Sequence, residues 1–131
     1  MTKYAAKIDI SNIVKDIIIL SDDVSDVETF CNNTFGGTWK ETFKDGTRKQ
    51  FAPIGGIYNS SKDKFICEQP FSSWTLDSND DWQPPVVMPD VSDENYKDRR
   101  WNEEIQKWTA LKVSEDVIYS WDASTSTWSQ L

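Results

Sequence analysis

The chain has 131 residues, with 22 acidic and 14 basic side chains, no histidine and a formal net charge of −8. This length fits one domain, or a domain with a small appendage, and can bury about 65–70% of the unfolded chain's surface. The acidic balance argues against nucleic-acid binding, because phosphate backbones are repelled. The longest apolar run, residues 17–20, is too short to cross a membrane, and we expect no signal peptide.

The residue types also narrow the chemistry. Without histidine, Ser-His and Cys-His nucleophile systems and histidine zinc sites are excluded. Acidic residues near aromatics fall in expected turns, where nothing raises their pKa, so a glycosidase is disfavoured. Cys31 and Cys67 lie far apart, and we expect two partly buried thiols rather than a disulfide. We therefore predict a non-enzymatic protein without cofactor or metal.

Two acidic stretches leave a weak surface ion site open. Residues 77–81 match the opening of an EF-hand loop, but Trp82 stands where glycine is needed and Met88 where glutamate is needed. Asp22, Asp23 and Asp26 form the second stretch, for which compensation of a helix dipole is the simpler explanation.

The first half of the chain predicts two hairpins. Residues 4–10 and 13–20 are apolar or alternating segments around a Ser-Asn turn, typical of paired strands. Residues 38–43 and 48–52 flank Asp45, which is followed by glycine, the strongest short hairpin signal. We expect these to pair with each other.

A short helix is predicted between the two hairpins, at about residues 26–33. Ser25 and Glu28 have the spacing of a capping box, with Ser25 as N-cap. The pair Gly36-Gly37 follows and is consistent with a helix C-terminus.

A recurring unit organises the rest of the chain. It begins with an aromatic residue followed by Asp or Asn, continues with a polar loop and ends on a second aromatic, which predicts a hairpin with cross-strand rings. Copies occupy residues 58–65, 101–108 and 121–128, and a shortened copy occupies residues 76–82. Residues 103–108 also suit a helix by propensity, and we choose the hairpin because of the repeat.

A proline-rich and acidic stretch, residues 84–95, interrupts the units. Its prolines cannot donate to a strand ladder, so it is not a central strand. We interpret it as a linker between an N-terminal β domain, residues 1–83, and a C-terminal aromatic hairpin module, residues 96–131.

The tryptophans have two interpretations. For Trp39 and Trp74 we favour a place in the core. Residues 96–131 hold few aliphatic side chains to cover their rings, so core and binding surface both stay open for this set. The candidate partner- or glycan-contacting residues are Trp101, Trp108, Tyr119, Trp121 and Trp128.

Several strings resemble a family of small proteins from marine tailed bacteriophages, of the cyanophage and pelagiphage type. They lie at residues 36–42, 52–58, 63–66, 69–77 and 82–86, and the closing aromatic-Asp-x5-Trp unit also fits. The most specific is Pro-Phe-Ser-Ser-Trp-Thr-Leu-Asp at 70–77. The chain departs from the family in a shorter hairpin at 44–48 and an extra C-terminal unit. The resemblance implies a phage origin and a virion structural role, and no catalytic residues transfer.

Together these patterns predict a mainly β protein of antiparallel hairpins and small sheets with one short helix. The function we expect is a non-enzymatic structural protein of a phage virion, in capsid decoration or in the tail and its fibres. Its partners would be phage capsid or tail proteins, without nucleic acid or membrane, and a homo-oligomer stays open. The alternative is a carbohydrate-binding module of a host-recognition fibre, with a host surface glycan as ligand.

Overall fold

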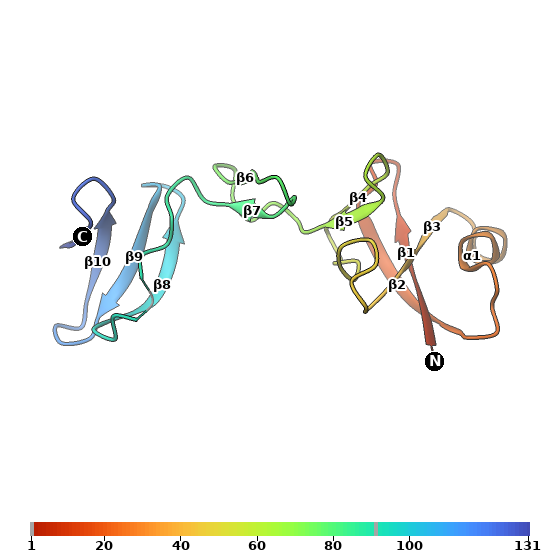
Figure 1. Ribbon diagram of the computed structural model, residues 1–131, viewed down its shortest axis with the longest axis horizontal. Coiled ribbons are helices and arrows are strands. Elements are labelled where there is room, and N and C mark those ends of the chain that lie inside the picture. Colours follow the sequence, from red (N-terminus) through yellow and green to blue (C-terminus); the bar gives the residue numbers. More distant parts are fainter. Residues whose placement is uncertain (1, 91) are drawn as a thin grey trace. The chain divides into compact units, whose positions relative to one another are not determined.

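The computed structural model describes residues 2–90 and 92–131 (Figure 1). Strands make up 42% of the chain and helix 7%, which confirms the predicted mainly β class. The elements are β1 (Thr2–Ile8), β2 (Val14–Ser21), α1 (Val27–Phe35), β3 (Thr38–Thr42), β4 (Ile57–Asn59), β5 (Lys64–Ile66), β6 (Thr75–Leu76), β7 (Trp82–Gln83), β8 (Tyr96–Asn102), β9 (Lys107–Lys112), β10 (Val117–Asp122) and β11 (Thr127–Gln130).

The chain forms two compact units, unit 1 (Met1–Gln69) and unit 2 (Pro70–Leu131). The division lies upstream of the linker that the sequence suggests at residues 84–95. It groups residues 70–83 with the C-terminal hairpins, whereas the position of the proline-rich stretch predicts that they belong to the N-terminal domain. The physical reason is Trp74, whose ring packs against Trp101 and Trp108.

Unit 1 is built on an antiparallel sheet with the strand order β2-β1-β3. β1 and β2 pair from Thr2 opposite Ser21 to Ile8 opposite Val14, so the first predicted hairpin is confirmed. Helix α1 contributes to the core on one face, and the β4–β5 hairpin contributes to the core on the other. The first core holds Ala5, Leu20, Val27, Cys31 and Trp39. The second holds Ala6, Ile8, Val14, Ala52, Tyr58 and Phe65.

The predicted hairpin between residues 38–43 and 48–52 is wrong. β3 forms as expected, but its partner in the sheet is β1, with Tyr4 opposite Thr42. Arg48 and Lys49 have φ angles of 59° and 73°, which take the returning segment out of the extended conformation. The two segments are joined instead by side-chain hydrogen bonds: Ala52 N donates to Thr42 Oγ1 over 2.8 Å at a buried position, and the Arg48 guanidinium donates to the Glu41 carbonyl.

Helix α1 confirms the predicted helix with a different start. Its N-cap is Asp26, whose carboxylate accepts from Thr29 N, so the prediction of Ser25 as N-cap is wrong. Glu28 does not close a capping box because it binds groups on β3 and the following loop. The helix ends at Phe35, and its C-cap is Gly36, whose φ of 73° suits glycine. Both cysteines are thiols, but the expectation that both are partly buried is wrong, because Cys31 is buried and Cys67 is exposed.

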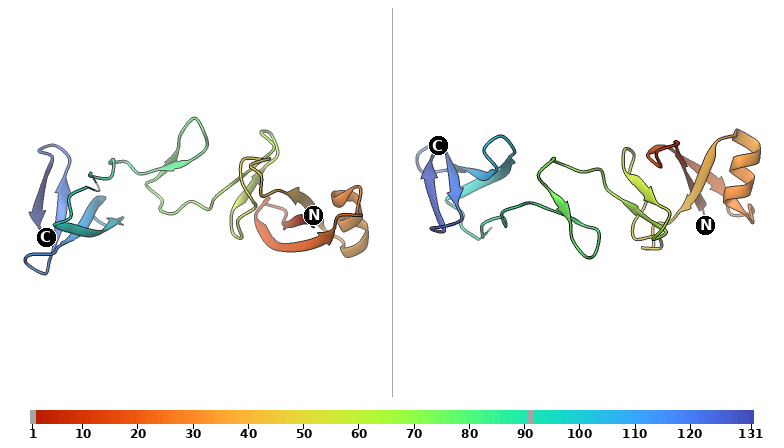
Figure 2. Two further views of the ribbon diagram at one scale, coloured as in Figure 1. Left: turned by 60° about the horizontal axis from the view of Figure 1, so that its bottom comes forward. Right: turned by 90° about the horizontal axis from the view of Figure 1, so that it is seen from above.

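The repeated unit does form hairpins. Tyr58 lies opposite Phe65, Leu76 opposite Trp82, Trp101 opposite Trp108, and Trp121 opposite Trp128. Residues 103–108 therefore belong to a hairpin and not to a helix, as the repeat predicts. In unit 2, β8 to β11 follow one another as a four-stranded antiparallel meander (Figure 2).

The four full-length hairpins share one loop geometry, including a copy that sequence inspection misses. The residue two places before the second paired position has a left-handed backbone: Asp63 (φ 52°), Gln106 (φ 50°), Asp116 (φ 55°) and Ser126 (φ 54°). Asp116 belongs to the hairpin of residues 111–118, where Leu111 lies opposite Ile118. An aliphatic pair replaces the rings there, so the aromatic pattern does not reveal this copy.

Candidate binding surface

One face of the unit 2 sheet carries all of the sheet's aromatic side chains. Opposed residues of antiparallel strands point to the same side, and successive residues alternate. The register therefore places these rings on a common face: Tyr96, Trp101, Trp108, Tyr119, Trp121 and Trp128. Arg100, Thr109 and Ile118 point to the other face, which is mostly polar.

Part of this aromatic face is a closed core, the inner cluster of Phe71, Trp74, Trp101 and Trp108. Trp101 and Trp108 are buried, with ring centroids 5.4 Å apart. Trp74 covers both rings at 6.2 and 6.3 Å, which fulfils its expected role in a core. The Trp108 indole Nε1 donates to the Val86 carbonyl over 2.7 Å. Trp101 and Trp108, two of the five candidate contact residues, are therefore buried in the core of unit 2.

Glu103 fastens the loop that carries Trp74. Its carboxylate accepts from Ser73 Oγ at 2.6 Å, from the Trp101 indole at 2.8 Å and from Ser72 Oγ at 2.8 Å. The Ser73 backbone amide donates a fourth hydrogen bond. These bonds, with those from Ser73 and Trp101 first, lower the pKa of Glu103 to about 2. The carboxylate therefore stays charged and bound to its donors at neutral pH.

The remaining rings form the outer cluster of Tyr96, Tyr119, Trp121 and Trp128, all partly exposed. Tyr96 stacks on Trp128 with centroids 4.9 Å apart and planes at 13°. Trp121 meets Trp128 edge to face at 5.2 Å, and Tyr119 meets Tyr96 at 5.8 Å. Three of the predicted contact residues, Tyr119, Trp121 and Trp128, are brought together here. Tyr96 completes the cluster and was missed by sequence reasoning.

Lys112 makes cation–π contacts with two rings of the outer cluster. Lys112 Nζ lies 4.9 Å from the Tyr119 ring centroid and 6.0 Å from that of Tyr96. Glu115 holds the ammonium group at 2.9 Å and also accepts from the Tyr119 hydroxyl. The hydrogen bond to Glu115 raises the pKa of Lys112, so the cation persists over the rings.

An apolar groove of about 410 Å³ borders the outer cluster. The segment Pro85–Pro89 forms one wall, and Trp121 and Ala123 form the other. Val87 and Met88 are 84% and 41% exposed, so the wall presents apolar side chains to solvent. Trp121 therefore contacts Trp128 within the outer cluster and also lines the groove.

The turn carboxylates serve their own loops. Asp122 Oδ1 accepts from the amide and the hydroxyl of Ser124. In the EF-hand-like stretch, Asp77 Oδ1 accepts from the amides of Asn79 and Asp81. Within residues 2–90 and 92–131, no group of three or more Cys, Asp or Glu side chains is arranged to hold a metal ion. Among the same residues, no helix is long and apolar enough to span a membrane.

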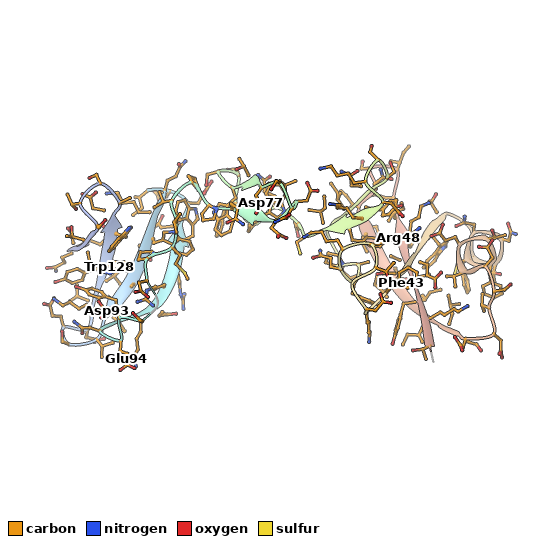
Figure 3. The ribbon with its side chains drawn as sticks, viewed as in Figure 1. Phe43, Arg48, Asp77, Asp93, Glu94 and Trp128 are labelled. Atoms are coloured by element: carbon orange, nitrogen blue, oxygen red, sulfur yellow. The ribbon has the colours of Figure 1, made fainter. Side chains whose placement is uncertain are left out.

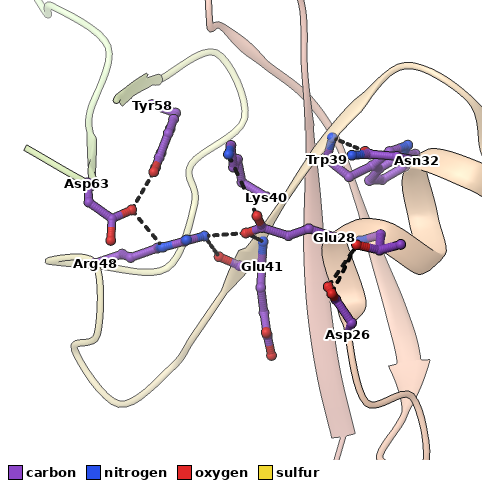
Figure 4. A network of polar contacts seen from close by, with 10 residues as sticks. Asp26, Glu28, Asn32, Trp39, Lys40, Glu41, Arg48, Tyr58 and Asp63 are labelled. Carbon is purple, nitrogen blue, oxygen red and sulfur yellow. Dashed lines mark hydrogen bonds and ion pairs between the residues drawn. The ribbon is translucent and has the colours of Figure 1, made fainter. Parts of the chain in front are cut away.

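Unit 1 has its own polar network, centred on Arg48 (Figure 4). The guanidinium donates to Glu28 Oε2 and to the Glu41 carbonyl at 2.8 Å, and it pairs with Asp63 at 2.9 Å. Burial acts to raise the pKa of Glu28, but bonds from the Glu41 amide and Arg48 outweigh it and lower the pKa. Burial and the bond to Asp63 raise the pKa of Tyr58 to about 12. The network joins α1, β3 and the β4–β5 loop.

No protein-family model, curated protein or solved structure matches this chain.

Proposed function

We propose that this chain is a non-enzymatic structural protein of a phage virion, which docks through the outer cluster of unit 2. The observation that supports this proposal is a set of partly exposed rings in mutual contact beside an open apolar groove: Tyr96, Tyr119, Trp121 and Trp128. Tryptophan and tyrosine are enriched in the residues that dominate protein interfaces. Stacking between rings also fixes their positions before binding, which lowers the entropic cost of association.

The setting in a phage particle rests on the resemblance of residues 36–42 and 69–77 to small marine phage proteins. A particle offers the same partner surface many times over. In a multimeric assembly, several modest contacts can then give stable attachment through avidity.

The first experiment is mass spectrometry of purified, nuclease-treated particles, with copy number measured against the major capsid protein. Hundreds of copies per particle indicate capsid decoration, and a few to a few dozen indicate the tail or its fibres. Absence of the chain from particles overturns the proposal.

A variant then tests the surface itself. Trp121→Ala removes the ring that borders the groove and is expected to weaken particle association at least about tenfold. Ile118→Ala is the matched control, because Ile118 lies on the same strand, is 44% exposed and points to the opposite face. Equal losses in the two variants would show that the aromatic face is not the docking surface.

A carbohydrate-binding module is the second candidate, favoured by Trp121 in the wall of a groove large enough for a sugar ring. In such a module the turn carboxylates would bond sugar hydroxyls, but Asp77 and Asp122 accept from their own loops. The geometry therefore favours a protein partner. A glycan array separates the two: in a glycan-binding module Trp121→Ala stays on the particle and loses glycan binding.

A further inference from the structure

The negative charge of the chain is concentrated in unit 2. Residues 70–131 contain 12 acidic and five basic side chains, a net charge of −7, whereas residues 1–69 contain ten and nine, a net charge of −1. The unit that contains the outer cluster therefore also has nearly all of the net negative charge, which would attract a positively charged partner.

Several of these carboxylates border the outer cluster. Glu115 binds the Tyr119 hydroxyl and the Lys112 ammonium group. Asp93 and Glu94 lie three and two residues before Tyr96, which stacks on Trp128. Figure 3 shows Asp93 and Glu94 in the same region of unit 2 as Trp128. Carboxylates thus lie beside the rings, together with the Arg99 guanidinium, which donates to the Asp93 carbonyl. The Glu94 side chain is exposed.

The rings also accept a cation within the chain itself. Lys112 lies over Tyr119, with Glu115 as its counter-ion. An aromatic face attracts a cation through its quadrupole, most strongly on tryptophan, and arginine adds planar stacking. Trp121 and Trp128 offer the same chemistry at the surface, next to a groove that takes apolar side chains.

We propose that the partner of this surface is a basic protein segment in which arginine alternates with small apolar residues. Its guanidinium groups stack on Trp121 and Trp128 within the field of Asp93, Glu94 and Glu115. Its apolar residues enter the groove between Pro85–Pro89 and Trp121. This inference rests on the proposed docking function and specifies the chemistry of the partner. Complementary charge would also speed the encounter and make binding sensitive to salt.

The test uses the full chain and three synthetic hexapeptides in which valine alternates with arginine, with glutamine or with glutamate. Binding is measured by tryptophan fluorescence and by titration calorimetry. The arginine peptide is expected to bind, and its affinity to fall as salt rises from about 50 to about 300 mM. The glutamine peptide is expected to bind at least about tenfold more weakly, and the glutamate peptide not at all.

Variants separate ring stacking from general attraction to an acidic protein. Trp121→Ala is expected to weaken arginine-peptide binding at least about tenfold, whereas Ile118→Ala leaves it unchanged. Glu94→Gln is expected to weaken it about two- to fivefold. Glu104→Gln is the matched charge control, because Glu104 is an exposed carboxylate in the loop beyond the inner cluster. Circular dichroism confirms that each variant is folded.

Two outcomes overturn the inference. Equal binding of the arginine and glutamine peptides would show that charge does not select the partner. Equal effects of Glu94→Gln and Glu104→Gln, with no effect of Trp121→Ala, would show that the peptide senses net charge alone. Either result leaves the docking function standing if Trp121→Ala still releases the chain from particles. Absence from particles would instead overturn the docking function.

Discussion

Arg48 and Glu103 each bind segments that are distant in sequence. Arg48 joins Glu28 on α1 to Asp63 in the β4–β5 loop, and Glu103 joins the Ser72-Ser73 loop to the β8–β9 hairpin. Both side chains have several partners, so removal of either leaves partly buried groups without their bonds. Substitution of either residue therefore tests how much its bonds contribute to the stability of its unit.

Arg48→Met is expected to destabilise unit 1 by about 1–2 kcal/mol. Methionine keeps most of the side-chain volume but leaves Glu28 without its guanidinium partner. The measurement is chemical denaturation followed by circular dichroism. Arg100→Met is the matched control, because Arg100 forms an exposed pair with Asp98 and should change stability by under about 0.5 kcal/mol. Equal effects of the two substitutions would contradict a structural role for the Arg48 network.

Glu103 predicts an acid transition in unit 2. Its pKa in the folded chain is about 2, below the ordinary value of 4.5. Because the folded pKa is depressed, the stabilisation is fully present above pH 4.5 and is lost as the pH falls to about 2. Tryptophan fluorescence should report this loss, since Trp74 and Trp101 lie beside the carboxylate.

In Glu103→Gln the acid transition should disappear from the fluorescence titration, while Glu104→Gln retains it. An unchanged titration in Glu103→Gln would mean that another carboxyl group controls the acid response of the Trp74 loop.

At the scale of elements, both units contain the same type of hairpin. The repeated hairpins, four in unit 2 and one in unit 1, place a left-handed residue two positions before the second paired residue, and none of these residues is glycine. The shortened hairpin of unit 2 does so with Asp80 (φ 60°). A left-handed backbone costs a non-glycine residue about 1–2 kcal/mol. The loops therefore hold a small strain that substitution can relieve.

Ser126→Gly is expected to stabilise unit 2 by about 0.5 kcal/mol, because relief of the left-handed strain exceeds the added entropy of the unfolded chain. Thr127→Gly, one residue later on β11, is the matched control and should destabilise it by about 0.5–1 kcal/mol. Guanidinium unfolding of the two variants gives the comparison. Destabilisation by both would show that the loop conformation is not under strain.

At the scale of the molecule, each unit has its own core. Unit 1 buries aliphatic and aromatic residues on both faces of its sheet, and unit 2 buries Trp101, Trp108 and Ala110. The loop carrying Trp74 belongs to unit 2 through Glu103 and the inner cluster. Residues 70–83 therefore depend on residues beyond them in sequence.

A fragment of residues 1–69 is expected to fold on its own. Its amide NMR spectrum should overlay the corresponding signals of the full chain. A fragment of residues 1–83 is the matched comparison: it lacks Trp101 and Glu103, so its extra residues should give signals of a disordered chain. A dispersed spectrum for residues 70–83 in that fragment would place the boundary later, where the sequence suggests the linker.

The sequence alone determined the mainly β class, the helix after the first hairpin and the aromatic hairpin unit, because these follow from local periodicity, capping and turn residues. It did not predict that β3 pairs with β1, since the positive φ of Arg48 and Lys49 carries no clear sequence signal. Aliphatic pairing of Leu111 with Ile118 likewise concealed one hairpin.

The tertiary structure decided which rings are core and which are surface. Strict alternation along β8 places Tyr96 and Trp101 on opposite faces, but a bulge at Asp98 turns Tyr96 onto the aromatic face. The Trp74 loop covers Trp101 and Trp108, while Tyr119, Trp121 and Trp128 stay partly exposed. Burial depends on contacts between residues far apart in sequence, and a local pattern does not encode those contacts.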